Sequence, residues 1–337
     1  MSPRKIAIVP LHEMTQGQEG DVFALMTEKQ ELKTRDGKPY FRVGFRDNKR
    51  ETSFPVWSDS PWAADCRDAW TPGAFYKIRA VYRETQYGPQ LEIRKIREVT
   101  DDDRADGFDP GMCLPSSRRE PSEMFDELLD LMKQEVEDAS LQQLVLAILT
   151  EHRDALLEGA AAQRHHHTYR GGLIEHMLSV VRNAVFFATK YTEDYPDLTP
   201  PLNRSLVVVG AALHDIGKLR ELAQLPTGVE YSPEGVLIGH ITLGRDIIRE
   251  FAAREDLAID PELQLRLEHL ILSHQRLPEW GSPKPPMTPE AILVHFSDDV
   301  DAKFNGMALI FEADSTPGPF TSTQNPLRQR FYRGENS

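Results

Sequence analysis

The 337-residue sequence predicts two domains of different fold class, a small all-β barrel followed by an all-α helical bundle. Between residues 20 and 98, short segments alternate apolar and polar side chains and end at turn residues, which is typical of β-strands. From residue 122 onward the apolar residues recur at helical spacing. The stretch between them combines an acidic run with Gly and Pro and has no periodicity, which indicates a linker. We expect the barrel in residues 1–100, the acidic linker in 101–121, the bundle in 122–313 and a loose tail in 314–337.

Five short strands account for the predicted barrel. Asp36-Gly37 is a strong hairpin signal, because the tight turns that join antiparallel strands require residues that tolerate positive φ. A second turn is expected at Tyr87-Gly88-Pro89. Five such strands, with a loop or short helix between the third and the fourth, fit a small closed barrel. The strands are expected at residues 22–26, 40–46, 52–57, 75–82 and 90–96.

The bundle is predicted from the 3.6-residue period of its apolar positions. Ser122 is expected as the N-cap of the first helix, because its hydroxyl can accept a hydrogen bond from a free backbone N–H. Pro226-Thr227-Gly228 and the Pro-rich residues 278–289 are expected as loops. Further helices are expected at residues 141–157, 172–191, 204–214, 243–253, 261–273 and 289–304.

Charge is distributed unevenly along the chain. The net charge of −14 argues against a protein that simply coats nucleic acid. Residues 1–100 carry 17 Lys and Arg against 14 Asp and Glu, a net charge of +3, whereas the remainder carries 22 against 39, a net charge of −17. The N-terminal part can therefore meet a phosphate backbone directly. The rest can do so only where a metal or local cations reverse the field.

Cysteine usage and hydropathy bear on location. Cys66 and Cys113 are isolated, so no cysteine metal motif exists and free thiols in a reducing cytoplasm are expected. No N-terminal apolar stretch is long enough for a signal peptide or membrane span. We expect a cytoplasmic protein with no membrane contact.

Aromatic and basic residues are interleaved in the predicted barrel. Stacking rings among cations are what proteins use to bind single-stranded nucleic acid. Most of these rings could equally belong to the barrel core, so the patch as a whole is a firmer prediction than any one member. The candidate nucleic-acid-binding residues are Lys38, Tyr40, Arg42, Phe45 and Trp57.

A histidine and an aspartate follow directly after the apolar run 206–213, which reads as a buried helix. Charge in such a place is costly unless a cation matches it, and imidazole and carboxylate are both good ligands for divalent metals. Other candidate ligands fall near the ends of different helices, which is how a bundle builds an inward metal site. The candidate metal ligands are His176, His214, Asp215, His240, His274 and Asp298.

The remaining histidines of the second half are less informative. His152, His269 and His295 are expected to be structural or surface groups. The run His165-His166-His167 is either a coincidental polar turn or a loop that lines the site. The candidate substrate-lining residues are His166, His167, Arg170 and Gln275.

The order of these motifs resembles the HD phosphohydrolase superfamily, whose pattern is His, His-Asp and Asp. Within it, the chain is similar to the YhaM-like 3′→5′ exoribonucleases, which carry an OB-fold before the HD domain. The resemblance covers roughly residues 20–310. It is carried by residues 164–176 (RHHHTYRGGLIEH), 213–218 (LHDIGK), 234–241 (EGVLIGHI), 271–275 (ILSHQ), Gly281-Ser282-Pro283 with Pro286-Met287, and 298–303 (DDVDAK).

The resemblance implies roles for single residues. Asp215 would bridge two metal ions, and Lys218 would reach a phosphate oxygen of the substrate; both are expected to be catalytic. Two divalent ions are implied, with Mn²⁺ the first choice and Fe, Mg, Co and Zn also open. Gln275 departs from the pair of adjacent histidines that relatives often have, and Asp299 stands where Asn is expected.

The function implied by the resemblance is metal-dependent hydrolysis of phosphodiester bonds. An attached OB-fold favours the 3′ end of single-stranded RNA, with DNA also open, cut to 5′-mononucleotides. An alternative is hydrolysis of a small nucleotide or cyclic dinucleotide, and another is a nucleic-acid-binding protein with a silent HD domain. Self-association into a homo-oligomer is left open.

Overall fold

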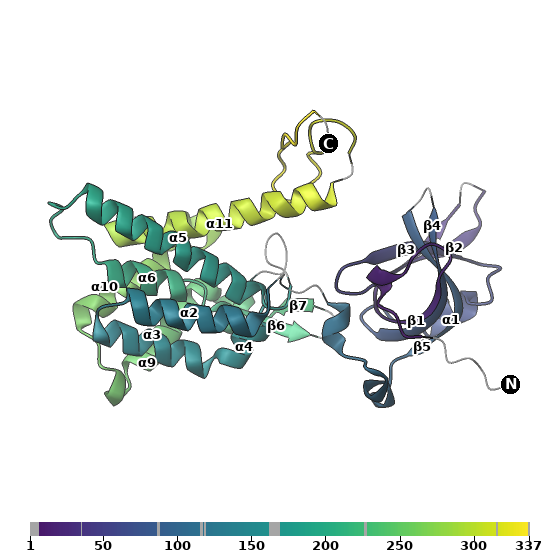
Figure 1. Ribbon diagram of the computed structural model, residues 1–337, viewed down its shortest axis with the longest axis horizontal. Helices are drawn as coiled ribbons and strands as arrows, with labels where there is room; N and C mark the ends of the chain where they lie inside the picture. The colour runs from purple at the N-terminus through teal and green to yellow at the C-terminus, as the bar shows by residue number, and fades with distance from the viewer. Residues whose placement is uncertain are drawn as a thin grey trace. The chain divides into compact units, whose positions relative to one another are not determined.

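The computed structural model describes residues 7–34, 36–85, 88–114, 117, 119–161, 169–225, 228–314 and 316–335. The main division of the chain into compact units falls after residue 116. The first unit is built from β-strands and the second from α-helices, as Figure 1 shows. The predicted order of fold classes, a β-barrel followed by a helical bundle, is therefore confirmed.

A single antiparallel sheet forms the first unit, with the strand order β3-β2-β1-β4-β5. The two outer strands of that order, β3 and β5, contact each other, so the sheet curls into a barrel. A short helix, α1, connects β3 to β4, and this arrangement is that of an OB-fold. The elements are β1 (Glu19–Lys33), β2 (Pro39–Arg46), β3 (Glu51–Trp57), α1 (Ala63–Asp68), β4 (Phe75–Thr85) and β5 (Gly88–Glu98).

Strand β1 is much longer than the predicted strand 22–26. Its first half pairs with β4 and its second half pairs with β2, and the register shifts between Met26 and Glu28. A bulge bends a strand, which lets one strand serve both sides of a barrel. The second half carries mostly charged and polar residues, so the apolar pattern that marks the strand in the sequence ends at Met26.

Residues 101–121 are not the linker that the acidic composition suggests. Two 3-10 helices, Asp101–Asp106 and Pro110–Cys113, lie in the segment. Phe108 and Cys113 are buried against Phe23 and Leu25 of β1. The segment up to residue 114 therefore packs on the barrel, because its few apolar side chains find a partner that the local sequence does not reveal.

The second unit is a helical bundle. A small hairpin, β6 (Leu222–Leu225) and β7 (Gly228–Tyr231), flanks the predicted loop at 226–228, and residues 226–227 lie outside the described residues. Helix α2 begins one residue before the predicted N-cap, because Pro121 takes the first helical position. The predicted helix 141–157 is two helices, which meet at His152. The helices are α2 (Pro121–Glu135), α3 (Ala139–Glu151), α4 (Arg153–Glu158), α5 (Gly172–Asp194), α6 (Arg204–Leu213), α7 (Lys218–Glu221), α8 (Pro233–Leu237), α9 (His240–Ala252), α10 (Pro261–Ser273) and α11 (Pro289–Ala313).

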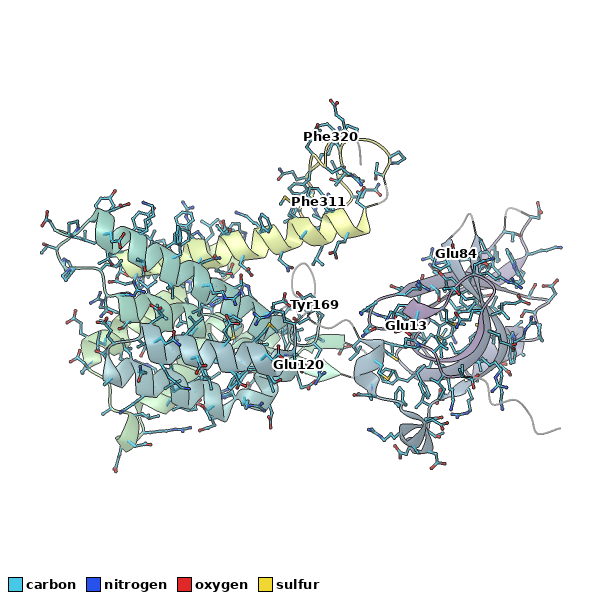
Figure 2. All side chains as sticks on the ribbon, in the orientation of Figure 1. Glu13, Glu84, Glu120, Tyr169, Phe311 and Phe320 are labelled. Atoms are coloured by element: carbon cyan, nitrogen blue, oxygen red, sulfur yellow. The ribbon has the colours of Figure 1, made fainter. Side chains whose placement is uncertain are left out.

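The C-terminal segment is more ordered than the loose tail that its composition suggests. Helix α11 continues to Ala313, nine residues beyond the predicted end at 304. Asp314 and Arg333 form an ion pair of 2.5 Å, and a β-bridge joins Phe320 to Tyr332. Figure 2 marks Phe311 on the last turns of α11 and Phe320 in the segment beyond it.

Both cysteines are free, as predicted, and both are buried. Burial raises the pKa of the Cys66 thiol to about 11 and that of Cys113 to about 12. Among the described residues, no helix has the length and apolar character that crossing a membrane requires.

A buried carboxylate ties the segment after β5 to the barrel. Asp103 is 2% exposed and receives two hydrogen bonds from the Arg97 guanidinium, at 2.6 and 2.7 Å, and one from Lys77 at 3.1 Å. The Arg97 hydrogen bonds outweigh burial and, with Lys77 and the backbone N–H of Thr100, hold the pKa of Asp103 well below its usual range. The ionised carboxylate therefore stabilises the folded state.

Asp103→Asn is expected to lower the free energy of unfolding of the first unit by about 2 kcal/mol at pH 7, because two cations lose their acceptor. The depressed pKa makes this stabilisation present above the unfolded-state pKa of about 3.9 and lost as the pH falls through the lower folded-state value. Urea unfolding, followed by tryptophan fluorescence between pH 3 and 7, measures the difference. The exposed neighbour Asp101→Asn is the control, and an equal loss in both variants would contradict the role of Asp103.

Candidate metal centre

The apolar helix α6 delivers the His-Asp pair to the interior of the second unit. Every residue from Ser205 to Leu213 is buried, and His214 and Asp215 follow with 0% and 1% exposure. Asn203 caps the start of the helix by accepting a hydrogen bond from Leu206 N–H at 2.9 Å. Because the helix is apolar on all sides, it is held in the core and its last turn positions the pair there.

Gly217 allows the turn after Asp215 to approach helix α9 closely. A Cβ atom at Gly217 would lie 1.9 Å from the carbonyl oxygen of His240 and 2.4 Å from the backbone nitrogen of Gly244. Both are backbone atoms, so no side-chain movement could relieve the clash. Glycine is therefore required in this motif for packing, and the packing brings His240 to Asp215.

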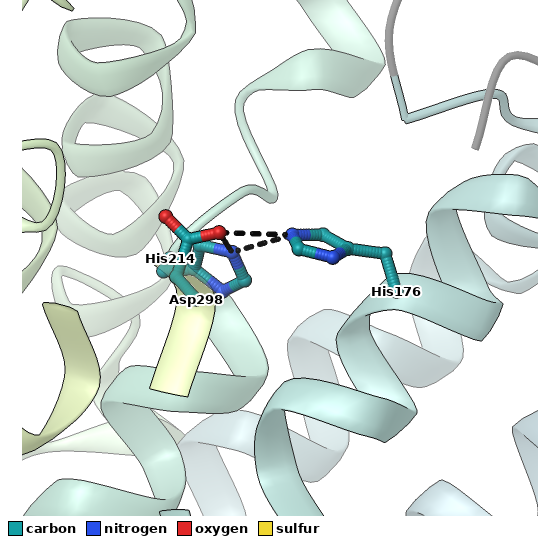
Figure 3. Close-up of side chains that lie close together, drawn as sticks. All are labelled: His176, His214 and Asp298. Atoms are coloured by element: carbon teal, nitrogen blue, oxygen red, sulfur yellow. Dashed lines mark hydrogen bonds and ion pairs between the residues drawn. The ribbon is translucent and has the colours of Figure 1, made fainter. Parts of the chain in front are cut away.

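One group of donor atoms joins helices α5, α6 and α11. Figure 3 shows His176, His214 and Asp298 pointing toward one another. His176 Nε2 lies 3.2 Å from His214 Nε2 and 3.3 Å from Asp298 Oδ1, and all three side chains are buried. Asp215 Oδ2 is close to the same atoms, at 3.3 Å from His176 Nε2 and 3.4 Å from His214 Nε2.

A second group lies on the other side of Asp215. Its Oδ1 atom is 3.4 Å from His240 Nε2 and 3.7 Å from His274 Nε2. One oxygen of the carboxylate therefore faces the first group and the other faces the second. A carboxylate placed in this way can bridge two cations.

The proton positions on the four histidines follow from their outer hydrogen-bond partners. The Nδ1 atoms of His176 and His240 lie 2.7 Å from Asp301 Oδ2 and 3.0 Å from Glu221 Oε1. The Nδ1 atoms of His214 and His274 lie 2.8 and 2.7 Å from backbone carbonyl oxygens. Carboxylates and carbonyls only accept, so each Nδ1 carries a proton and each ring turns its Nε2 atom toward the centre.

Asp301 and Glu221 are the residues of the candidate site that sequence reasoning missed. Each holds a histidine by its outer nitrogen, which fixes the tautomer and the ring orientation. Asp301 lies three residues after Asp298 on α11, one helical turn away and on the same face. This spacing in the sequence could have identified Asp301 as part of the site. Glu221 has no such local signal, because its partner His240 is distant in sequence.

The arrangement of the donor atoms suits a bound divalent metal better than it suits hydrogen bonds among the donors themselves. Asp215 Oδ1, His240 Nε2 and His274 Nε2 are buried and have no hydrogen-bond partner. Buried polar atoms are rarely left in this state. Two donors bound to one ion at about 2.1 Å lie roughly 3.0–3.4 Å apart. The shortest separations in both groups have that size, from 3.2 to 3.4 Å.

The ionisation of the ligands also suits a metal. Burial lowers the pKa of His274 to about 3, helped by its neighbour His214, so the ring is neutral at pH 7. Burial alone would raise the pKa of Asp215, but Lys218 and His214 outweigh it and lower the pKa well below its usual range. For Asp298, His176 and His214 outweigh burial in the same way and lower the pKa. The carboxylates are therefore ionised.

Lys218 lies beside the shared carboxylate. Its Nζ atom is 2.6 Å from Asp215 Oδ2, three residues earlier on the same turn, and the residue is 8% exposed. The ammonium group therefore stands next to the first donor group, and its contact with a substrate phosphate stays a prediction.

The other candidate residues are placed less centrally. Gln275 adjoins the centre, with Nε2 3.4 Å from Asp298 Oδ2. Arg170 hydrogen-bonds Glu158 at 2.5 and 2.7 Å and belongs to neither donor group. His166 and His167 lie outside the described residues. The histidines expected to be structural, His152, His269 and His295, hydrogen-bond backbone atoms and belong to neither group.

The barrel carries only part of the predicted aromatic-basic patch. Tyr40 and Trp57 pair across β2 and β3 with ring centroids 5.0 Å apart, and Trp57 is 47% exposed. Lys38 is exposed, and Arg42, on the same face as Tyr40, pairs with Glu28. Phe45 is 0% exposed, so its assignment to the nucleic-acid surface is wrong. Its odd position in β2 turns it to the inner face, since alternate residues of a strand point in opposite directions.

Known protein families and proteins are similar to this chain in the segment that holds the site and over nearly its whole length. The HD domain family model matches residues 173–303, the segment that contributes every ligand described above. The 3′-5′ exoribonuclease YhaM of Bacillus subtilis (strain 168) is 31% identical over 327 residues, which cover 96% of this chain and 97% of that protein. The chain belongs to the YhaM family. Its counterpart in Listeria monocytogenes (serotype 4b, strain CLIP80459) is 32% identical over 325 residues, with 94% and 95% covered.

YhaM-family membership covers both units, because the alignments extend over nearly the whole chain. A solved structure, the second OB-fold domain of replication protein A from Methanococcus maripaludis, aligns with 28% of this chain and 96% of its own at 13% identity and a TM-score of 0.22. The strand order and the place of α1 carry the OB-fold assignment in this chain. The HD domain implies dependence on a divalent metal, and the two donor groups are where the chain would hold it.

Asp301→Asn is expected to weaken Mn²⁺ binding 10- to 100-fold, because His176 loses the carboxylate that fixes its tautomer. Isothermal titration calorimetry of the full chain with Mn²⁺ measures the change. Asp299→Asn is the matched control, since Asp299 lies on the same helix and pairs with Lys303 at 2.7 Å. Equal affinities for the Asp301 variant and the wild type would contradict the assignment.

Proposed function

We propose that this chain is a metal-dependent 3′→5′ exoribonuclease that shortens single-stranded RNA to 5′-mononucleotides. The observation that carries the proposal is the carboxylate of Asp215, with one histidine group on each of its oxygens and Lys218 at 2.6 Å. Full-length similarity to proteins named 3′-5′ exoribonuclease YhaM supports the direction and the substrate.

Hydrolysis of the 3′-terminal linkage has simple bond changes. The oxygen of water bonds to the phosphorus of the last nucleotide, the bond from that phosphorus to the preceding O3′ breaks, and O3′ leaves with a proton. Divalent cations supply a water of lowered pKa and neutralise charge on the phosphoryl oxygens. Lys218 contributes a further positive charge next to Asp215, where charge develops on the phosphoryl group.

The chain's own residues hold the reacting groups in place. The four Nδ1 hydrogen bonds keep the imidazoles from rotating, so the Nε2 atoms need no rearrangement during the reaction. Burial of His176, His214 and Asp298 keeps bulk water from competing for the same positions. Preorganisation of this kind lowers the barrier more than binding alone does.

We infer that the centre takes two ions and that Mn²⁺ is the first candidate. The two donor groups, each with histidine nitrogens and at least one carboxylate oxygen, support a count of two. Mixed imidazole and carboxylate ligands suit Mn, Fe, Co, Zn and, less well, Mg. Measurement of bound metal in protein purified without added salts distinguishes these ions.

The remaining partners stay predictions. Single-stranded DNA is an open second substrate, and a small nucleotide or cyclic dinucleotide is the alternative substrate class. A cytoplasmic location and self-association are also predicted.

A groove of about 620 Å³ lies between α5 and α11 and is lined by apolar side chains such as Tyr191, Phe296 and Val300. It offers a surface for self-association, which sedimentation velocity of the full chain would detect.

Incubation of the purified chain with Mn²⁺ and 5′-labelled single-stranded RNA is expected to shorten the RNA stepwise, and excess EDTA is expected to stop the reaction. Asp215→Asn is expected to lower the rate by at least about 10³-fold, because the shared ligand loses its charge. Denaturing gels resolve the products. No shortening by the wild type, or shortening that EDTA leaves unchanged, would rule out the proposal, and full activity of the variant would favour a silent HD domain.

Trp57→Ala is expected to raise the KM for single-stranded RNA about tenfold and to leave kcat unchanged, because loss of one base-stacking ring removes binding distant from the chemistry. Phe186→Ala is the matched control, since Phe186 is an exposed aromatic residue of the second unit with 64% exposure. If the substrate is a small nucleotide, KM stays the same in both variants.

A further inference from the structure

The turn after His274 holds an arginine in a strained backbone conformation. Arg276 has φ of 67°, and among the described residues the only other non-glycine with positive φ is Arg328, at 49°. Leu277 N–H donates to the carbonyl oxygen of Gln275 at 2.8 Å, which closes a three-residue turn around Arg276. Turns of this kind with positive φ at the centre are rare and strained. Strain persists only where the surroundings impose it, and it gathers at functional sites.

One end of this turn contacts a candidate metal ligand, and both ends are held by Ser282. The turn starts directly after His274, and Gln275 Nε2 lies 3.4 Å from Asp298 Oδ2. Gln275 N–H donates to Ser282 Oγ at 3.1 Å, and Ser282 N–H donates to the Leu277 carbonyl at 3.2 Å. Ser282 is 0% exposed, so the closing point of the loop is part of the core. The loop therefore cannot move far from the centre without breaking this network.

The loop presents cations that have no partner and an exposed aromatic ring. Arg276 and Lys284 are exposed, and the charged group of neither side chain forms an ion pair or hydrogen bond with any described residue. Trp280, between them, is 52% exposed. Glu279 is the one acidic residue of the segment 275–284. Unpaired cations beside an exposed ring are the combination that binds single-stranded nucleic acid.

The position of these groups matters because the rest of the chain is acidic. Residues 101–337 carry a net charge of −17, so a polyanion approaching the centre needs local positive charge. Arg276 is two residues from His274, and consecutive Cα atoms are about 3.8 Å apart, so the Cα atom of Arg276 lies within about 8 Å of that of His274.

We propose that the loop 275–284 positions the RNA beside the metal centre, with Arg276 on a backbone phosphate and Trp280 stacked on a base near the 3′ end. The inference rests on the proposed function and adds the element that selects a polynucleotide over a small phosphodiester. Lys284 adds a second cation along the same loop. Arg276 and Trp280 are positioning residues, since the reacting atoms belong to the metal centre.

The strain at Arg276 provides the decisive test. Glycine adopts positive φ without cost, so Arg276→Gly relieves the strain while removing the guanidinium group. We expect the melting temperature of this variant to equal or exceed that of the wild type. We also expect kcat/KM for 5′-labelled single-stranded RNA to fall about tenfold, and Trp280→Ala to cause a similar loss. Mn²⁺ affinity, measured by calorimetry, is expected to stay unchanged in both variants.

Arg328→Gly is the matched control, because it also exchanges an exposed arginine of positive φ for glycine, far along the chain from every ligand. Unchanged RNA kinetics in the Arg276 and Trp280 variants would overturn the inference and leave the proposed function intact. A parallel loss of Mn²⁺ affinity would also overturn it, because the loop would then only support the ligands. If the wild type fails to shorten RNA, the proposed function fails first and the inference fails with it.

Discussion

The buried carboxylate of Asp215 is the constraint on which the second unit depends. Its two oxygens face imidazole nitrogens that arrive from α5, α9 and the ends of α6 and α10. An ionised group at 1% exposure is stable only if positive charge lies close to it, and Lys218 supplies one such charge. The convergence of four imidazoles on this carboxylate suits a site that holds divalent cations.

The outer hydrogen bonds show a repeated design in the two donor groups. Each group contains one histidine whose Nδ1 is held by a carboxylate, His176 by Asp301 and His240 by Glu221. Each also contains one histidine, His214 or His274, that directly follows a helix and is held by a carbonyl of the preceding turn. The carbonyl-held rings need no partner from elsewhere, whereas the carboxylate-held rings tie separate elements together. Loss of either carboxylate therefore affects the packing of helices as well as the ligand.

The candidate ligands were predictable because they stand in short motifs near helix ends. At such places the local sequence shows where the side chain lies in the bundle. What the sequence did not reveal depends on contacts between distant segments. Glu221 meets His240 only after the turn at Gly217 brings α7 against α9. Phe45 and Tyr40 are both aromatic residues of β2. They differ in the face of the strand on which they lie, because Phe45 points to the inner face and Tyr40 to the outer face. The segment 101–114 reads as polar linker, yet Phe108 and Cys113 are enough to dock it on the barrel.

The placement of charge explains how an acidic protein can process a polyanion. Most arginine and lysine side chains of the second unit are paired on its surface, for example Arg220 with Glu250 and Arg254 with Glu151, and such pairs offer phosphate little. The cations without partners at Arg276 and Lys284 lie on the loop that follows His274. Beside the candidate metal centre, these unpaired cations offset the repulsion that the acidic second unit exerts on a polyanion. Binding and chemistry become coupled in this proposal, because the loop that carries these cations begins directly after His274 and contacts Asp298 through Gln275.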